Sequence, residues 1–361
     1  MNVVPEAPTR RRVLIAGAGL GLSVTACARD VDPSEDARGP GFHGLRQAGV
    51  TTPRQATVLL LAYDLDPGLR GAAGARALKA VLGSWTDALA ETLESDGSRA
   101  TRLTATVGIG PALPAALGLR APAALRELPV FTGDRLDPER CGGDVLVQLC
   151  ADTADATEAV AETLTRLAGE TLVPRGRQDG FLPPSPDGDS TPRDLLGFED
   201  GAANPTPEEC ERWVWSGNAT YLVVRRIHLR LEDFARLAVR RQEEIIGRGR
   251  STGGPSTGGP SAGGPEDADA APPRSHLRAV DPRLDSGARM LRRGYSYADG
   301  PADQGQLFLA FMRDPALFVR VQRRMAAQDE LSGFAEARGS AVAYVLPGAR
   351  PGRPLGADLL T

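Results

Sequence analysis

The residues best suited to chemistry in this chain lie in a short loop and in two later segments. Residues 197–205 read GFEDGAANP, in which two glycines and an Asn-Pro break helices and strands alike. Such a loop lets the backbone approach a ligand closely, and it carries the carboxylates of Glu199 and Asp200. A histidine, His276, follows in SHLR, and an arginine, Arg292, follows in LRRGYSY. These three residue types can transfer a proton, ligate an iron and stabilise a developing anion.

An isolated Asp-Gly is usually a solvated surface turn, so the loop alone would indicate little. The combination of an acid, a histidine and an arginine, each on its own segment, is the residue set of a haem peroxidase site. This interpretation requires the surrounding elements to bring the three segments together.

The composition limits the classes of function. The chain has 361 residues, enough for two domains or one large one, and a formal net charge of −4. It has no basic stripe interleaved with aromatic residues, which argues against nucleic acid as a partner. The four cysteines, Cys27, Cys141, Cys150 and Cys210, form no C-x-x-C motif, which argues against a zinc site. Cys141 and Cys150 could form a disulfide in an oxidising compartment, or could stay free thiols.

The N-terminus has the pattern of a targeting segment. Three consecutive arginines, residues 10–12, precede an apolar, Gly/Ala-rich run over residues 13–26, and residues 1–29 are therefore predicted to be a twin-arginine-type signal peptide. The sequence VTAC at residues 24–27 is similar to a bacterial lipobox, which would place a lipid on Cys27. Plain cleavage near this position is the alternative. Residues 30–40 are polar and are predicted to be a flexible tether. We expect an exported protein that is periplasmic, extracellular or anchored to a membrane by that lipid.

Hydrophobic periodicity predicts that the two halves of the chain have similar arrangements of strands and helices. In the first half the pattern predicts strands over 56–63, 103–110 and 144–150, and helices over 70–94 and 157–167. In the second half it predicts strands over 219–229, 306–312 and 340–346, and helices over 231–246 and 316–325. This alternation predicts an α+β fold of two ferredoxin-like domains, residues 41–190 and 191–361, each an antiparallel sheet with helices. Residues 249–273, with serial Gly-Gly-Pro repeats, are predicted to be a flexible surface loop that buries no core.

With these motifs in place, the chain resembles the dye-decolourising peroxidase family, in its exported class related to bacterial deferrochelatase/peroxidases. The resemblance covers roughly residues 41–348. It is carried by the segments FHGLRQAGVTTP, TVGIGP, RQDGF, TPRDLLGFEDGAANP, TYLVVRRI, RQEEIIGR, SHLR, LRRGYSY, LFLAF and GSAVAYVLPG. The resemblance implies two ferredoxin-like domains with one haem b held in the C-terminal domain.

The resemblance also implies roles for individual residues. His276 would be the proximal ligand of the haem iron, in competition with His43 and His228, the other histidines of the chain. Asp200 would be the distal acid that carries the peroxide proton. Arg292 would stabilise charge on the leaving oxygen and keep Asp200 ionised, and the neighbouring Arg293 is its rival for that role.

Further residues would line the haem by the same resemblance. Leu309 and Phe311 would form an apolar wall of the distal cavity, although both are also typical core residues of a strand. The remaining haem-binding positions are Gly201, Ala202 and Ala203 in the loop, and Asp281, Pro282 and Arg283 after SHLR, where Arg283 is suited to a propionate. Ala202 departs from the Thr that is usual in the family, and Asp281 departs from the usual Asn or His.

The resemblance implies an enzyme that reduces hydrogen peroxide and oxidises phenolic or dye-like electron donors. One alternative keeps the haem but releases its iron, as a deferrochelatase does. Another is a haem-binding or haem-delivery lipoprotein without catalysis. The sequence predicts no nucleic-acid partner and no membrane contact except through Cys27, and it leaves homo-oligomerisation open.

Overall fold

Nine strands form one continuous sheet in the computed structural model, which describes residues 40–183, 193–199, 204–250 and 265–360. The signal segment, the tether, Cys27, Asp200, Gly201, Ala202 and Ala203 lie outside the described residues. The strands are β1 (Thr57–Leu65), β2 (Thr104–Ile109), β3 (Val145–Ala151), β4 (Leu172–Phe181), β5 (Thr220–Leu229), β6 (Leu291–Arg292), β7 (Tyr295–Ala298), β8 (Gln304–Met312) and β9 (Ala335–Val345).

The strand order shows that each half of the chain is ferredoxin-like. The order is β5-β9-β2-β3-β1-β4-β7-β8-β6, and β5 also pairs with β8. Followed in one direction around the sheet, the first half contributes β2-β3-β1-β4 and the second half contributes β7-β8-β5-β9. Counting these four strands of each half in chain order, both halves have the order second-third-first-fourth. Because β5 pairs with β8, eight strands close into a ring, and the named ladders are antiparallel. The predicted fold class is confirmed.

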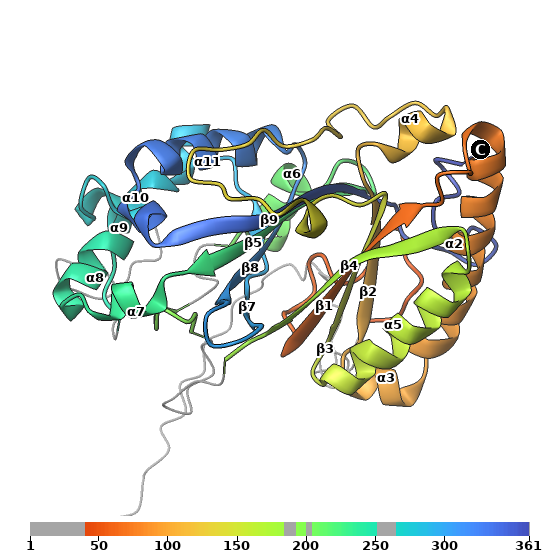
Figure 1. Cartoon of the computed structure of the whole chain (residues 1–361), viewed down its shortest axis with the longest axis horizontal. Helices are drawn as coiled ribbons and strands as arrows, with labels where there is room; N and C mark the ends of the chain where they lie inside the picture. The colour runs from red at the N-terminus through yellow and green to blue at the C-terminus, as the bar shows by residue number, and fades with distance from the viewer. Residues whose placement is uncertain (1–39, 184–192, 200–203, 251–264, 361) are drawn as a thin grey trace, which may run out of the picture. The chain divides into compact units, whose positions relative to one another are not determined.

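The helices cover the outer face of this ring (Figure 1). In the first half they are α2 (Gly71–Leu93), α3 (Asp96–Ala100), α4 (Leu113–Leu117) and α5 (Ala154–Ala168), with the short 3-10 helix η1 (Pro138–Arg140). In the second half they are α6 (Pro207–Trp213), α7 (Leu231–Ala235), α8 (Val239–Ile246), α9 (Pro265–Ala270), α10 (His276–Ala279) and α11 (Ala316–Gln328), with η2 (Pro282–Asp285) and η3 (Glu330–Gly333). None of the helices in the described parts of the chain is long and apolar enough to cross a bilayer.

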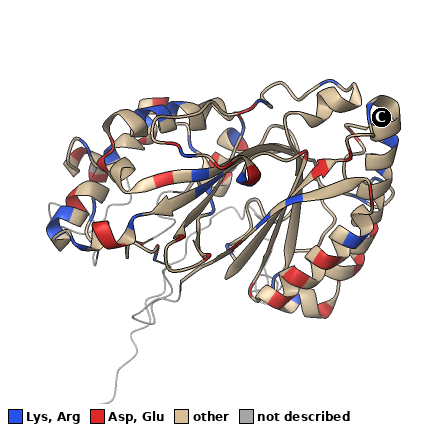
Figure 2. Ribbon diagram, viewed as in Figure 1, with Lys and Arg blue, Asp and Glu red and all other residues tan. Residues whose placement is uncertain are grey.

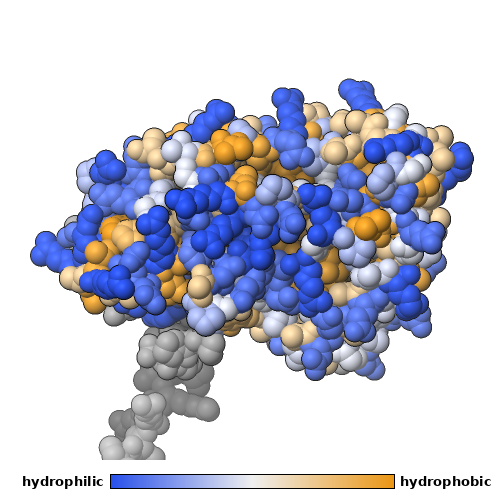
Figure 3. Space-filling model, in the orientation of Figure 1, coloured by the Kyte–Doolittle hydropathy of each residue, from blue (hydrophilic) through white to orange (hydrophobic). Residues whose placement is uncertain are grey.

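Alternation along the strands divides the core into two layers. Leu307, Leu309 and Phe311 of β8 belong to an inner cluster with residues of β1, β3, β5 and β9, inside the ring. Ala310 and Met312 belong to an outer cluster, between the strands and the helices, which also contains Trp85 of α2 and Phe318 of α11. The face of the molecule in Figure 3 is mostly hydrophilic, with small apolar patches. Both basic and acidic residues lie on the covering helices (Figure 2).

The structure corrects several predictions of local structure. The predicted helix over 231–246 is two helices, because the Gln242 side chain donates to the carbonyls of Phe234 and Leu237 at 3.1 and 2.9 Å and holds the break between them. Part of the predicted surface loop over 249–273 is ordered, since α9 forms there and Ala268 and Ala271 are buried. The Gly-Gly-Pro repeats, except for Pro265, fall in residues 251–264 and lie outside the described residues.

No disulfide joins the cysteines that the structure describes. Cys141, Cys150 and Cys210 are all free thiols, and Cys150 and Cys210 are buried. The alternative of free thiols therefore holds for these residues, and the Cys141–Cys150 disulfide is wrong.

Candidate active site

The histidine predicted to bind iron starts the short helix α10. Ser275 caps this helix, since its hydroxyl accepts from the backbone N–H of Arg278 at 3.4 Å and donates to the carbonyl of Pro272 at 2.8 Å. His276 Nδ1 lies 2.7 Å from Oδ2 of Asp329, whose side chain is fully buried, whereas the imidazole is 28% exposed. An ionised carboxylate can only accept, so Nδ1 carries a proton, and in the neutral imidazole the lone pair is then on Nε2. This is the tautomer that a metal-ligating histidine needs.

Helix α11 fixes the position of α10. Arg324 of α11 donates from Nε to the carbonyl of Ala279 at 2.6 Å, which satisfies an end group of α10. The same guanidinium donates to Asp285 at 2.7 Å, and Arg320 donates to the other oxygen of Asp285 at 2.9 Å. The Asp285 side chain is only 2% exposed, so its two arginines neutralise a buried charge. The histidine is thus held by a network rather than by the four residues of its own helix.

The predicted distal arginine lies on the edge strand β6. Leu291 pairs with Phe311 of β8, and Arg292 pairs with Ala310. The side-chain amide of Asn204, at the end of the GFEDGAANP loop, accepts from the Arg292 N–H at 3.0 Å and donates to the Arg292 carbonyl at 2.8 Å. These two bonds attach the end of the loop to the backbone of Arg292. We did not single out Asn204 from the sequence, although it lies within the quoted motif.

The rival arginine, Arg293, is part of the core. Its side chain donates to the carbonyl of Thr52 and, at 2.8 Å, to Oε1 of Gln55, both in the first half of the chain. Arg293 itself is only 2% exposed. Burial raises the pKa of the Cys150 thiol in the inner cluster, and the positive charge of Arg293 partly offsets this rise. The guanidinium of Arg293 therefore points to the inside of the ring.

Strand register places Arg292 on the outer face of the sheet, and the packing of α11 places the helix of His276 on the same face. Residues directly opposite in an antiparallel pair share a face, so Arg292 lies on the face of Ala310, which belongs to the outer cluster. Phe308, two residues before Ala310, packs against Phe318 of α11 with 6.0 Å between ring centroids. The helix α11 that covers this face also holds α10. Arg292 and the His276 helix thus share the outer face, whereas Arg293 faces inward.

Leu309 and Phe311 lie on the other face. Both are fully buried in the inner cluster, and alternation along β8 separates them from Ala310 and Arg292. The register therefore favours Phe308, which the sequence reading passed over, as an apolar wall on the face that Arg292 shares. The roles of Leu309 and Phe311 in a distal cavity stay predictions. Their placement on the face opposite to Arg292 argues against these roles.

The segment after α10 forms a compact ion-pair cluster. Asp281 caps η2 by accepting from the N–H of Arg283 at 2.9 Å, and Pro282 occupies the first turn. The Arg283 guanidinium pairs with both Asp281 and Asp269 of α9. Burial alone would raise the pKa of the Asp281 carboxyl, but hydrogen bonds from the Arg283 side chain and backbone outweigh burial and keep it below its ordinary value. A propionate at Arg283 would have to share this cation with two carboxylates.

The loop that carries the predicted acid is anchored just before it. Gly197 has a φ of 86°, which favours glycine, and Phe198 is buried against Phe234 at a centroid distance of 6.5 Å. Glu199 forms an ion pair with Arg193 at 3.6 Å. Asp200, Gly201, Ala202 and Ala203 lie outside the described residues, so their roles stay predictions.

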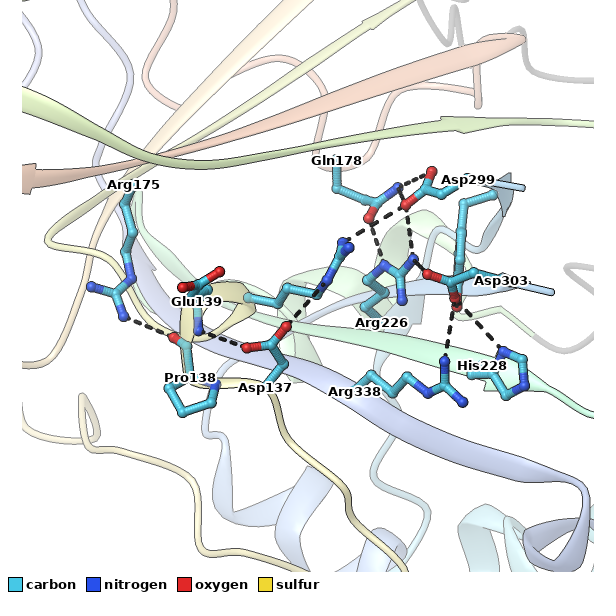
Figure 4. Close-up of polar contacts among 12 residues, drawn as sticks. Asp137, Pro138, Glu139, Arg175, Gln178, Arg226, His228, Asp299, Asp303 and Arg338 are labelled. Carbon is cyan, nitrogen blue, oxygen red and sulfur yellow. Dashed lines mark hydrogen bonds and ion pairs between the residues drawn. The ribbon is translucent and has the colours of Figure 1, made fainter. Parts of the chain in front are cut away.

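The two competing histidines are in other surroundings. His43 lies 3.8 Å from Glu94 in the first half of the chain. His228 on β5 faces Asp303 at 3.7 Å, and Asp303 also meets Arg338 and Arg226 (Figure 4). The buried Nδ1 of His228 has no hydrogen-bond partner among the residues that the structure describes. Neither histidine has the short carboxylate bond that orients His276.

His228 makes a testable contribution to stability. Burial and the nearby Arg338 lower the pKa of His228 in the folded protein. In the unfolded chain the pKa of histidine is about 6.5, so the unfolded chain binds this proton more tightly than the folded protein does. The free energy of unfolding is expected to fall as the pH drops through this range, and His228→Gln should reduce that fall. Urea denaturation at pH 8 and pH 5.5 of both proteins measures it. Equal pH dependence in the two proteins would contradict the prediction.

Comparison with known proteins identifies the family of this chain. The family models "Dyp-type peroxidase, N-terminal" and "Dyp-type peroxidase, C-terminal" match residues 47–182 and 191–350. The dye-decolorizing peroxidase of Thermobifida fusca is 34% identical over 96% of this chain and 94% of its own length. The deferrochelatase of Escherichia coli K12 is 27% identical over 95% of this chain and 94% of its own. An oxyferrous/water mixed complex of DtpA from Streptomyces lividans is 34% identical, with a TM-score of 0.81 over 91% of this chain and 99% of that one. The chain belongs to the Dyp-type peroxidase family.

Proposed function

We propose that this protein is a haem-dependent peroxidase with one haem b per chain, bound through Nε2 of His276. The observation that carries the proposal is the 2.7 Å contact of His276 with the buried Asp329, on the face of the sheet that Arg292 shares. The oxyferrous complex of the Streptomyces lividans relative adds support for iron in this family. Hydrogen peroxide is the proposed oxidant, and a phenolic or dye-like compound is the proposed electron donor.

The residues on this face fit the group. Asp329 keeps a proton on Nδ1 of His276 and makes Nε2 a better ligand. Carboxylates that accept from the second ring nitrogen have this effect on metal-bound histidines in general. A bound haem would supply an iron that takes the oxidising equivalents of peroxide and passes them to the donor. The imidazole of His276 is partly exposed, and the network around α11 fixes the helix that carries it.

The distal residues would handle the proton and the charge. Asp200 would accept the proton from one peroxide oxygen and return it to the other, which needs a carboxylate at hydrogen-bond distance. Arg292 would stabilise the charge on the leaving oxygen and favour the ionised form of Asp200. Asn204 would hold the backbone of Arg292 for this task through its two hydrogen bonds.

The two adjacent arginines give a matched test of this function. Arg292→Leu is expected to slow the reaction with peroxide about 10²–10³-fold while haem stays bound, because one fixed donor to the developing charge is lost. Arg293→Leu is expected to lower the melting temperature, because it leaves acceptors of Thr52 and Gln55 without a donor, but to keep the rate per bound haem. Stopped-flow absorbance with hydrogen peroxide measures the rates. A slow Arg293→Leu enzyme beside an unaffected Arg292→Leu enzyme would reverse the assignment.

A second candidate is release of iron from haem, which the named activity of the Escherichia coli relative favours. Both candidates use His276 to hold the haem, so they differ in the product. Incubation with added haem followed by porphyrin fluorescence separates them, since only iron release yields metal-free porphyrin. A peroxidase is expected to give coloured donor product and no porphyrin.

We also propose that the protein is exported by the twin-arginine route, with Cys27 as the candidate lipid site. The support is the run Arg10, Arg11 and Arg12 before an apolar segment. Changing these three residues to Lys is expected to leave the haem protein in the cytoplasm, whereas Arg29→Lys should export normally. Fractionation followed by haem staining measures the distribution. Equal export of the two variants would contradict the route.

A further inference from the structure

A cavity lies far from the candidate active site, where two irregular segments meet the end of β9. Its volume is about 340 Å³, within the range of small-molecule pockets. The loop at residues 120–123 forms one wall, the segment 344–348 lies beside it, and the C-terminal segment 353–359 forms the other wall. In Figure 1, α4 and the C-terminal end lie at the right of the molecule and α10 at the left, so the cavity is well separated from the helix that carries His276.

The walls of this cavity are held in place before any ligand binds. The C-terminal segment folds back on the first half, where the Leu355 N–H donates to Thr86 Oγ1 at 3.0 Å and Leu346 N–H donates to Val107 O at 3.1 Å. Three prolines, Pro122, Pro347 and Pro354, restrict the lining backbone. A wall that is already rigid loses little entropy when a ligand binds.

An aromatic surface lies against this cavity. Tyr344 lines the cavity and packs edge-to-face on Tyr221, with 5.4 Å between centroids. Tyr221 in turn accepts from the Ala124 N–H at 3.2 Å, which ties the loop to the sheet. The Tyr344 hydroxyl makes no hydrogen bond within the described residues, and burial raises its pKa, so it stays a neutral donor. The remaining lining is largely apolar, through Ala, Pro and Leu side chains.

The charge of the lining favours an anion. Arg353 pairs with Asp358, so these two charges cancel within the wall. Arg120 is exposed and has no carboxylate partner in the part of the chain that the structure describes. One guanidinium without a partner beside an apolar, aromatic surface can bind one acidic group, but not a chain of phosphates.

We propose that this cavity binds a small organic anion with a flat apolar body. The sulfonate or carboxylate would pair with Arg120, the body would pack on Tyr344 and the prolines, and the Tyr344 hydroxyl would donate the second hydrogen bond. The proposal does not rest on haem binding or on peroxidase activity, because every residue in it lies outside the candidate active site.

Calorimetric titration with 2-naphthalenesulfonate tests the proposal on the full chain as purified. We expect one saturable site, and Arg120→Gln should weaken binding about tenfold because a charge-assisted hydrogen bond is lost. Tyr344→Phe, which removes only the hydroxyl, should weaken it about threefold. Arg76→Gln, at an exposed arginine of α2, is the matched control and should bind as the parent does.

Two further probes separate the contributions of charge and shape. Naphthalene-2-methanol, which lacks the charge, and inorganic sulfate, which lacks the apolar body, should each bind at least tenfold more weakly than the sulfonate. The proposal is overturned by the absence of saturable binding, or by Arg120→Gln binding as tightly as Arg76→Gln. Equal affinity for sulfate would also overturn it, because the cavity would then hold an adventitious ion only.

Discussion

Replacement of His276 by Ala is expected to remove most of the haem from the purified protein. In the proposed site the His276 imidazole supplies the one bond from the protein to the iron. Without it, the porphyrin is held only by apolar contacts and by interactions of its propionates. The ratio of haem absorbance to protein absorbance measures the loss. His43→Ala removes an imidazole from the first half of the chain and is expected to leave haem content unchanged, which makes it the matched control.

A second variant tests the orientation of that imidazole. Asp329→Asn keeps the shape of the buried partner but replaces the charged acceptor of the Nδ1 proton. Haem affinity is expected to fall about 10–100-fold, less than for loss of the ligand itself, and the reduction potential of the iron should rise. Retention of full haem content by His276→Ala, with loss in His228→Ala, would place the ligand on β5 and contradict the site.

Replacement of Asp200 by Asn is expected to keep the haem and slow its reaction with peroxide about 10²–10⁴-fold. Asn matches Asp in shape, but its amide cannot take the peroxide proton as a base, and positioned proton transfer typically contributes this much. Stopped-flow absorbance at increasing peroxide concentration measures the second-order rate constant.

The neighbouring acid supplies the control for this variant. Glu199→Gln removes a carboxylate that pairs with Arg193, and it is expected to react at nearly the parent rate. If Asp200→Asn reacts with peroxide as fast as Glu199→Gln does, the proton is carried by Arg292 or by water, and the role of Asp200 is wrong.

The parts of the fold with strong periodicity could be predicted from the sequence. Helix α2 was expected over residues 70–94 and spans Gly71–Leu93, because its apolar residues recur at helical spacing and are buried, as at Leu78 and Trp85. Strand β4 was missed because its sequence, LVPRGRQDGF, is polar, and only its pairing with β1 over nine positions makes it a strand. Helix α9 was missed because Ala268, and Ala271 just after the helix, are buried by tertiary contacts that composition does not reveal.

The candidate site was predictable only where a motif names a residue. His276 and Arg292 lie in distinctive segments, but Asp329 has no local signal, since it is 53 residues from the histidine that it orients. The choice between Arg292 and Arg293 depended on strand register, which adjacent sequence positions cannot supply. Leu309 and Phe311 show the same limit, because either face of β8 carries apolar residues and only pairing with β6 distinguishes the faces.

The most direct test of the central claim is an absorption spectrum of the purified protein before and after one equivalent of hydrogen peroxide. The account predicts the spectrum of a histidine-ligated haem at one per chain, a change within the mixing time of a stopped-flow instrument, and return to the starting spectrum when a phenolic donor is added. A protein that takes up no haem when haem is supplied, or that binds haem whose spectrum peroxide leaves unchanged, would contradict it.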